Sequence, residues 1–178
     1  FEAWKTHTET WVQKAVLEQA QLLLFPEYGS MELVSLFPAE IQGDLQRQVR
    51  EMDLFRDDFC AVFADLARKY GVIIVAPSYP VWVNEQVFNR CFVFGPQGTI
   101  GYQDKYFMTR FELEEWAVHA APARLCVFEA NWGRFGIQIC YDIEFPIGAA
   151  LLSDAGAEVI LAPSCTETLQ GATRVHVG

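Results

Sequence analysis

The sequence has no long hydrophobic run. Its longest apolar stretches, such as residues 22–25 and 72–77, are far shorter than the roughly 20 residues that a membrane-spanning helix needs. The first residues, Phe1 to Lys5, form neither a basic leader nor an apolar signal segment. We therefore expect no membrane partner and a cytoplasmic location.

Basic residues are also in short supply. The chain has 13 lysine and arginine residues against 23 acidic ones, which gives a formal net charge of −10 at pH 7. A surface of this sign repels phosphate groups, so the composition argues against nucleic acid and anionic membranes as partners.

Paired cysteines and clustered histidines are absent as well. The five cysteines are scattered with no C-x-x-C pair, and the three histidines form no group with ligand spacing. Such a set is a poor disulfide framework and a poor zinc site. We expect no metal and no cofactor, and we expect most of the cysteines to be small buried apolar residues.

What the sequence does contain is ample material for a core, because 52% of its 178 residues are hydrophobic and 14% are aromatic. Apolar residues at helical spacing predict helices over about 6–19 and 52–70, and Pro146 opens a third helix that reaches about residue 154. Continuous apolar runs predict buried strands. These strands are residues 22–25, 72–76 and 159–162.

Two predicted hairpins interrupt this alternation, one centred on Gly95-Pro96-Gln97-Gly98 and one on Asn131-Trp132-Gly133. The segment between them, residues 104–122, reads as a long irregular loop, which in a compact domain is usually functional. The pattern as a whole predicts one domain over residues 1–178, with a layered α/β fold and a mixed sheet. The predicted hairpin strands are residues 87–94, 99–103, 124–129 and 134–139.

Glu27, Lys105 and Cys140 each stand at the end of a predicted strand. Ligands of α/β proteins collect where strands end, because the loops there are free to vary on a rigid scaffold. A cysteine nucleophile needs a base that takes its proton and a donor that holds the developing oxyanion. The histidines offer no convincing base, which leaves a carboxylate.

Each of the three residues also has a plain structural interpretation. Cys140 lies six residues before Pro146, where the positive end of a helix favours a thiolate, but most cysteines of this kind are simply buried. A glutamate or lysine that leaves the core at a loop is usually a solvated surface residue. Spacing alone does not show whether the three side chains meet.

The residues around the three side chains form motifs. Pro26-Glu27-Tyr28-Gly29 follows the first strand, and Gly101-Tyr102-Gln103-Asp104-Lys105 ends the first hairpin. Gly136-Ile137-Gln138-Ile139-Cys140-Tyr141-Asp142 is followed by Phe145-Pro146. These motifs resemble, in the same order, the glutamate, lysine and cysteine motifs of the nitrilase superfamily of carbon–nitrogen hydrolases. Asn89 and the glycines of the first hairpin match the segment that precedes the lysine.

The resemblance implies a four-layer αββα sandwich of the nitrilase type, which we expect to be a fragment that lacks the first strand and the C-terminal part. It implies that Glu27 deprotonates Cys140, that the thiol attacks an amide, carbamoyl or nitrile carbon, and that Lys105 stabilises the tetrahedral intermediate. A thioester then forms and is hydrolysed. The resemblance also implies a homodimer or larger homo-oligomer.

A second glutamate often supports the lysine in this superfamily, from the loop that follows it. Glu112, Glu114 and Glu115 all lie in that loop, and the register favours Glu114. The oxyanion is expected to be bound by Lys105 together with the backbone N–H of Tyr141.

Five residues are candidates for the substrate pocket or its support. Phe107, Trp116 and Tyr141 are expected to line the pocket, although aromatic residues are more often part of a core. Cys165 stands at another strand end and is expected to face the same space. Asp142, next to Tyr141, is expected to brace the turn of the nucleophile.

The leading hypothesis is therefore an amidase-type hydrolase that acts on a small linear amide or carbamoyl compound. A nitrilase that acts on a nitrile is an alternative within the superfamily. A catalytically silent scaffold or binding protein of the same fold is a second alternative, and a redox-sensing Cys140 with Cys165 as resolving cysteine is a third. The presence of all three motif residues favours an enzyme.

Overall fold

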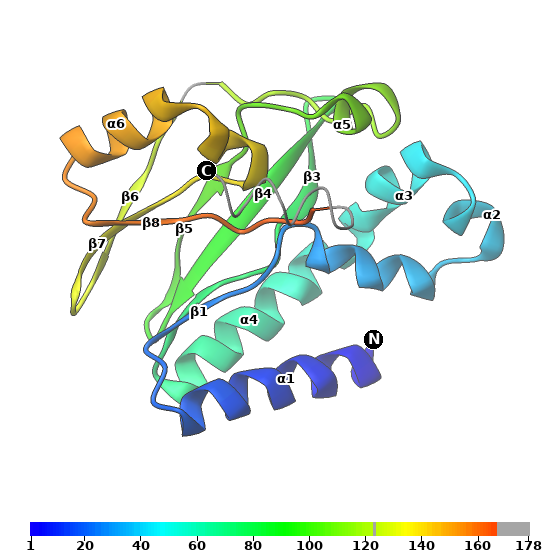
Figure 1. Ribbon diagram of the computed structural model, residues 1–178. Coiled ribbons are helices and arrows are strands. Elements are labelled where there is room, and N and C mark those ends of the chain that lie inside the picture. The colour runs from blue at the N-terminus through cyan, green and yellow to red at the C-terminus, as the bar shows by residue number, and fades with distance from the viewer. Residues whose placement is uncertain (123, 167–178) are drawn as a thin grey trace.

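The computed structural model describes residues 1–122 and 124–166, which form four layers (Figure 1). The helices α1 (Glu2–Leu17) and α4 (Arg56–Tyr70) make the first layer and pack on a five-stranded sheet. A three-stranded sheet packs on the opposite face, and α6 (Pro146–Asp154) lies outside it. The predicted αββα sandwich is confirmed.

The larger sheet is mixed. The parallel pair is β1 (Leu22–Leu24) with β2 (Ile73–Val75), and β2 continues antiparallel to β4 (Gln86–Gly95). The long strand β4 also pairs antiparallel with β3 (Tyr79–Val83) and with β5 (Gly98–Asp104). Because β4 is long, it pairs with β2 near its end and also forms hairpins with both β3 and β5.

The smaller sheet consists of β6 (Val127–Ala130), β7 (Gly133–Ile137) and β8 (Val159–Leu161). The strands β6 and β7 form an antiparallel hairpin, whereas β7 and β8 are parallel and α6 lies between them in the chain. Because β7 and β8 are parallel, the segments that follow them leave the sheet at the same edge.

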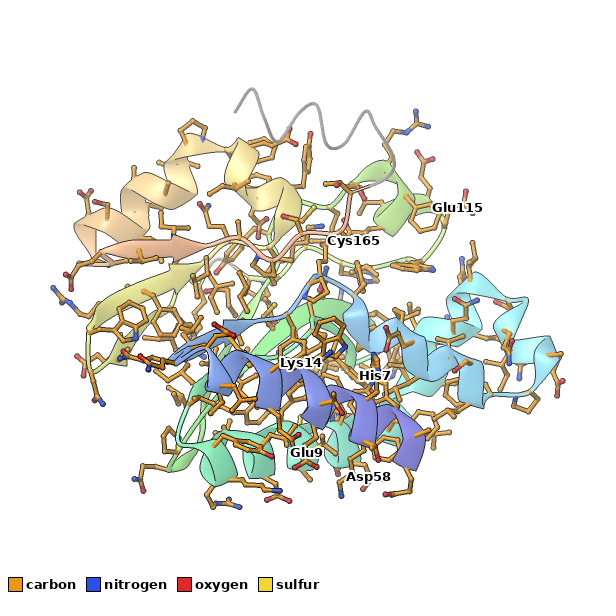
Figure 2. The ribbon with its side chains drawn as sticks, turned by 60° about the horizontal axis from the view of Figure 1, so that its bottom comes forward. His7, Glu9, Lys14, Asp58, Glu115 and Cys165 are labelled. Atoms are coloured by element: carbon orange, nitrogen blue, oxygen red, sulfur yellow. The ribbon has the colours of Figure 1, made fainter. Side chains whose placement is uncertain are left out.

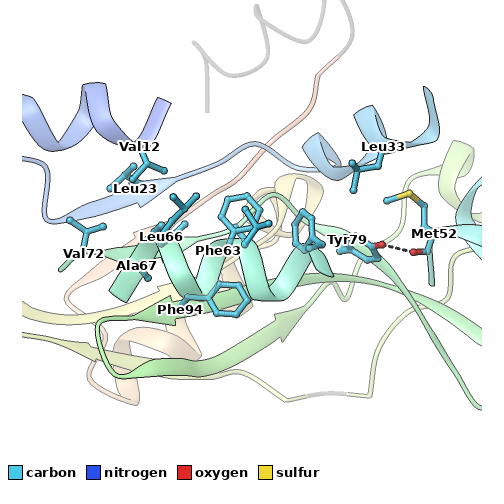
Figure 3. Close-up of a cluster of buried hydrophobic side chains, with 14 of the residues drawn as sticks. Val12, Leu23, Leu33, Met52, Phe63, Leu66, Ala67, Val72, Tyr79 and Phe94 are labelled. Atoms are coloured by element: carbon cyan, nitrogen blue, oxygen red, sulfur yellow. Dashed lines mark hydrogen bonds between the residues drawn. The ribbon is translucent and has the colours of Figure 1, made fainter. Parts of the chain in front are cut away.

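The main hydrophobic core lies between α1, α4 and the larger sheet (Figure 3). Phe63 is at its centre, fully buried among the rings of Trp4, Phe25, Phe59 and Phe94. A second cluster joins the two sheets. Its buried members are Val75, Cys91, Val93, Phe128, Phe135, Ile137 and Ile139.

Local sequence explains why α4 begins and ends where it does. Asp57 and Asp58 occupy its first turn, and Arg68 and Lys69 occupy its last, so both ends have side chains that complement the helix dipole. Gly71 follows with φ +67°, a left-handed conformation that glycine adopts without steric cost.

Two glycines let α6 approach the smaller sheet closely. A side chain at Gly136 in β7 would meet the Leu152 side chain at 2.7 Å, and one at Gly148 in α6 would meet the Gln138 amide at 2.0 Å. Because neither glycine has a side chain, the helix that follows the Cys140 turn packs directly on the end of β7.

The structure corrects several expected boundaries. The predicted helix 52–70 begins as the 3-10 helix η2 (Met52–Phe55), and the predicted loop 104–122 contains the helix α5 (Arg110–Glu114). The hairpin strand expected from residue 124 begins at Val127. No strand was predicted at β3, nor any helix between residues 29 and 51. That segment contains η1 (Gly29–Leu36), α2 (Ala39–Gln42) and α3 (Leu45–Glu51), joined by two short non-helical links.

Among the described residues, no helix has both the length and the apolar character needed to span a membrane.

The core predicts the effect of truncating Phe63. We expect Phe63→Ala to lower the free energy of unfolding by about 3–5 kcal/mol, because the surrounding rings cannot close the cavity. Leu17→Ala is the control, since that side chain is 82% exposed and its loss is expected to cost less than about 0.5 kcal/mol. Urea unfolding followed by circular dichroism measures both, and equal losses would contradict this picture of the core.

Candidate active site

Glu27, Lys105 and Cys140 come together where strands of both sheets end. Glu27 follows β1, Lys105 follows β5 and Cys140 follows β7. Lys105 Nζ lies 2.7 Å from Glu27 Oε1, and both residues are buried, with 1% and 4% of their surfaces exposed. The Cys140 thiol lies close enough to the Glu27 carboxylate for that carboxylate to raise the thiol pKa. Glu27 therefore lies between the ammonium and the thiol.

Glu112, not Glu114, is the second glutamate that contacts Lys105. Lys105 Nζ lies 2.7 Å from Glu112 Oε2, whereas Glu114 is exposed and pairs with Arg110 on the surface of α5. The expectation that Glu114 supports the lysine is thus wrong.

The start of α5 explains the correction. Thr109 precedes the helix and forms a capping box with Glu112, whose carboxylate accepts from the Thr109 backbone N–H at 2.9 Å. This turns Glu112 toward Lys105, while Glu114, two residues further along, lies about 200° around the helix and points to solvent. The sequence signal was present as Thr109-x-x-Glu112, which is the usual pattern of a capping box.

Asn89 and Tyr28, to which the sequence assigned no role, complete the network. Asn89 Nδ2 donates to Glu27 Oε1 at 3.0 Å and to Glu112 Oε1 at 3.2 Å, so one amide bridges the two carboxylates. The Tyr28 hydroxyl donates to Glu112 Oε1 at 2.9 Å. These contacts fix the orientation of both carboxylates around Lys105.

The charges of the network follow from its contacts. Burial opposes the charge of Lys105, but the Glu27 and Glu112 carboxylates outweigh it and raise the lysine pKa. Burial likewise opposes the charge of Glu112, and Lys105 and Thr109 outweigh it and lower the glutamate pKa. Burial, with the negative charges of Glu112 and Glu27, raises the pKa of Tyr28 well above its usual value, so Tyr28 is a neutral donor.

Cys140 lies in a strained turn at the start of η3 (Cys140–Glu144). Its φ is +49°, in the left-handed region that residues with a side chain rarely adopt, and its backbone N–H donates to the Pro163 carbonyl oxygen at 2.9 Å. The thiol is half-buried, and Sγ lies 3.9 Å from the Cys165 carbonyl oxygen.

Cys165 contributes its backbone to the same place. Its N–H donates to Glu27 Oε2 at 3.2 Å. Glu27, which follows a strand of the larger sheet, is thus also bound by the backbone that follows a strand of the smaller sheet. Figure 2 shows Cys165 beyond the end of β8, on the side of the molecule away from α1 and α4. The parallel pairing of β7 and β8 thus brings Cys140 and Cys165 to one edge.

Burial, followed by the negative charge of Glu27, raises the pKa of the Cys140 thiol to about 11. The thiol is therefore protonated at neutral pH. The expectation that a helix N-terminus favours a thiolate here is wrong for the resting protein, because burial and the adjacent carboxylate act in the opposite direction.

The predicted aromatic residues lie on two sides of this centre. Phe107 stacks on Phe145 with ring centroids 3.8 Å apart, and the Tyr141 ring meets the same Phe145 edge-on at 5.1 Å. Trp116 packs against Tyr28 with ring centroids 4.7 Å apart, and the hydroxyl of that Tyr28 donates to Glu112. All three are half-buried. Among the described residues, no group of three histidine, cysteine or acidic side chains could hold a metal ion.

Comparison with known sequences points to one family. Residues 2–177 match the carbon–nitrogen hydrolase family profile. The probable hydrolase YhcX of Bacillus subtilis is 34% identical over 176 residues, which cover 99% of this chain and 34% of that protein. Omega-amidase NIT2 of Danio rerio is 27% identical over 117 residues, covering 62% of this chain and 42% of that protein. The chain thus spans less than half the length of these two relatives.

Solved structures show the same fold at low sequence identity. A carbon–nitrogen hydrolase from Helicobacter pylori G27 matches with a TM-score of 0.76 and 16% identity, over 97% of this chain and 60% of that one. Nit3 of Saccharomyces cerevisiae, a member of the nitrilase superfamily, matches with a TM-score of 0.74 and 21% identity, over 99% of this chain and 63% of that one. An amidase mutant from Nesterenkonia sp. AN1, with acrylamide added to its active-site cysteine, matches with a TM-score of 0.70 and 20% identity, over 93% and 62%. The family profile, which covers almost the whole sequence, shows that this chain belongs to the carbon–nitrogen hydrolase family.

Proposed function

We propose that the protein hydrolyses a non-peptide carbon–nitrogen bond of a small linear amide or carbamoyl compound through a thioester on Cys140. The observation that carries the proposal is the placement of Glu27, whose carboxylate lies 2.7 Å from the Lys105 ammonium and close enough to the Cys140 thiol to raise the thiol pKa. A base, a charged donor and a nucleophile thus share one buried site. The names of relatives that are amidases support an amide as substrate.

The first step begins from a neutral thiol, since the pKa of Cys140 is raised to about 11. Glu27 takes the thiol proton as Sγ attacks the carbonyl carbon, and the C=O electron pair moves onto oxygen. The oxyanion is bound by the Lys105 ammonium and the Tyr141 backbone N–H. The ammonium retains its charge throughout, because Glu112 still balances it after Glu27 has been neutralised.

In the second step the tetrahedral intermediate collapses. The C–N bond breaks, Glu27 returns its proton to the nitrogen, and ammonia or an amine leaves while the thioester remains on Cys140. Glu27 then takes a proton from water as the water oxygen attacks the thioester carbon. The C–S bond breaks, the acid is released, and the proton on Glu27 restores the thiol.

Replacing the nucleophile tests this mechanism in the full-length protein. Wild type and Cys140→Ala are incubated with a panel of small amides, carbamoyl amino acids and nitriles, and ammonia release and adduct mass are measured. We expect an adduct on Cys140 and a loss of turnover of more than about a thousandfold in the variant. Turnover that survives in Cys140→Ala would exclude the mechanism, and turnover of nitriles alone would establish a nitrilase.

Glu112 and Glu114 offer a matched pair of substitutions within α5. We expect Glu112→Gln to lower kcat on the order of 100-fold, because Lys105 loses a charged partner and shifts from its position beside the oxyanion. Glu114→Gln removes only an exposed pair with Arg110 and is expected to leave kcat within about twofold. Steady-state kinetics on the best amide of the panel measures both, and equal effects would refute the assignment of Glu112.

The raised pKa of Cys140 predicts how the rate of its alkylation depends on pH. The rate of reaction with iodoacetamide is expected to rise about tenfold per pH unit from pH 7 to pH 10, because the thiolate fraction grows throughout this range. A thiol with the ordinary pKa of about 8.5 levels off above pH 9. Peptide mass spectrometry follows Cys140 separately from the other cysteines, and a rate that is constant from pH 7 would show a thiolate instead.

A further inference from the structure

Asp142 is fully buried beside the site, yet it takes no part in the proton transfers proposed above. Its Oδ1 accepts from the backbone N–H groups of Tyr106 at 3.1 Å and Phe107 at 2.8 Å. Its Oδ2 accepts from the backbone N–H of Ile139 at 3.1 Å. One carboxylate thus holds three backbone donors.

These donors belong to the two segments that carry the reacting groups. Tyr106 and Phe107 directly follow Lys105, at the end of a strand in the larger sheet, and Ile139 directly precedes Cys140, at the end of a strand in the smaller sheet. Asp142 therefore links the backbone beside the ammonium to the backbone beside the thiol.

The turn that Asp142 closes is strained. A left-handed φ such as the +49° of Cys140 persists only where surrounding contacts hold it. Besides the bond to Ile139, the Asp142 carbonyl oxygen accepts from Gln138 Nε2 at 3.3 Å, and the Cys140 N–H donates to Pro163. The Asp142 carboxylate is the contact that also reaches the Lys105 segment.

We propose that Asp142 is a positioning residue, which sets the separation of the Cys140 thiol and the Lys105 ammonium on either side of Glu27 by holding both backbones with one carboxylate. The inference rests on the proposed function and adds a residue that determines the geometry of the proposed active site. It predicts that loss of this carboxylate separates the thiol from its base without removing any reacting group.

The charge state of Asp142 agrees with this role. Burial raises its pKa to about 6, although the three backbone N–H groups and the charge of Lys105 act to lower it. Among the described residues, the Tyr106 phenol and the Cys91 thiol also interact with Asp142, and their pKa values are both raised, so both are neutral at pH 7. The carboxylate is therefore charged at neutral pH and gains a proton as the pH falls through about 6.

The sign of the stability effect is also informative. The folded-state pKa lies above the ordinary aspartate value, so the folded protein binds this proton more tightly than the unfolded chain does. The resulting stability is present below the ordinary pKa and is lost as the pH rises through about 6. The charged carboxylate thus costs stability at neutral pH, which is the opposite of what a residue that serves stability alone would do.

The test compares Asp142→Asn with Asp154→Asn in the full-length protein. Asp154 is an exposed aspartate at the end of α6 and makes a matched control. In Asp142→Asn the new amide offers one acceptor oxygen and turns an N–H₂ group toward the Ile139 N–H, so the turn is expected to open. On the best amide of the panel we expect kcat to fall on the order of 100-fold with KM within threefold, while the control stays within twofold.

A second measurement separates positioning from general destabilisation and needs no substrate. As the turn opens, Cys140 moves away from Glu27, and its pKa falls toward the ordinary value. Alkylation of Cys140 by iodoacetamide at pH 8 is then expected to become about tenfold faster in folded Asp142→Asn, although kcat is lower. If no amide is turned over by the wild type, the proposed function fails, and alkylation still tests Asp142.

If Asp142→Asn does not fold, hydrogen exchange of the wild-type protein tests the proposed role of Asp142 instead. At pH 5, relative to pH 7.5 and after correction for intrinsic rates, the backbone N–H groups of Tyr106, Phe107 and Ile139 are expected to gain protection together, because an opening that exposes Asp142 to water gives up the proton that the closed form binds more tightly. Unchanged protection in either segment would overturn the proposal. So would a folded Asp142→Asn whose kcat and alkylation rate both stay within threefold of wild type.

Discussion

The pairing of the buried Lys105 ammonium with two carboxylates is the interaction on which the rest of the site depends. Removing such a charge from water costs several kcal/mol, and the cost is offset only if charged partners surround it with good geometry. Glu27 and Glu112 both lie 2.7 Å from Nζ, and Asn89 bridges the two carboxylates. The three charged groups therefore hold one another in place, since removing Lys105 would leave two buried carboxylates without a cation, and removing either glutamate would leave the ammonium with a single charged partner.

The four-layer fold supplies these groups from different places. Glu27 and Lys105 leave strands of the larger sheet, and Cys140 leaves a strand of the smaller one, so the packing between the sheets sets the distance from Glu27 to Cys140. The apolar cluster between the sheets fixes that packing. Glu27 accepts from the Cys165 backbone and Asp142 accepts from the Lys105 segment, and these polar contacts align the sheets at the site itself.

The same burial that holds the lysine keeps the thiol neutral. Cys140 faces a carboxylate in a partly desolvated space, and both effects raise its pKa. As the proposed nucleophile, such a thiol depends on a base at the moment of attack rather than on a preformed thiolate. Glu27 suits the proposed role of this base, because Lys105 fixes one of its oxygens while its second oxygen faces the smaller sheet.

Local sequence determined a good deal about this protein. The apolar runs predicted β1, β2 and β8, the proline at residue 146 marked the start of α6, and motif order identified Glu27, Lys105 and Cys140 as the residues to examine. These features are readable because strand burial, helix starts and reactive motifs each depend on neighbouring residues. The capping box of Thr109 and Glu112 was equally local and was overlooked.

Tertiary structure alone decided which side chains meet and in what charge state. The sequence places Asn89, Tyr28 and Asp142 far from the groups they contact, and only the pairing of strands brings them together. The protonation of Cys140 likewise follows from desolvation and from Glu27, more than a hundred residues away in the chain. A sequence records which chemical groups are available, whereas their distances and dielectric surroundings, which set interaction energies and pKa values, exist only in the folded chain.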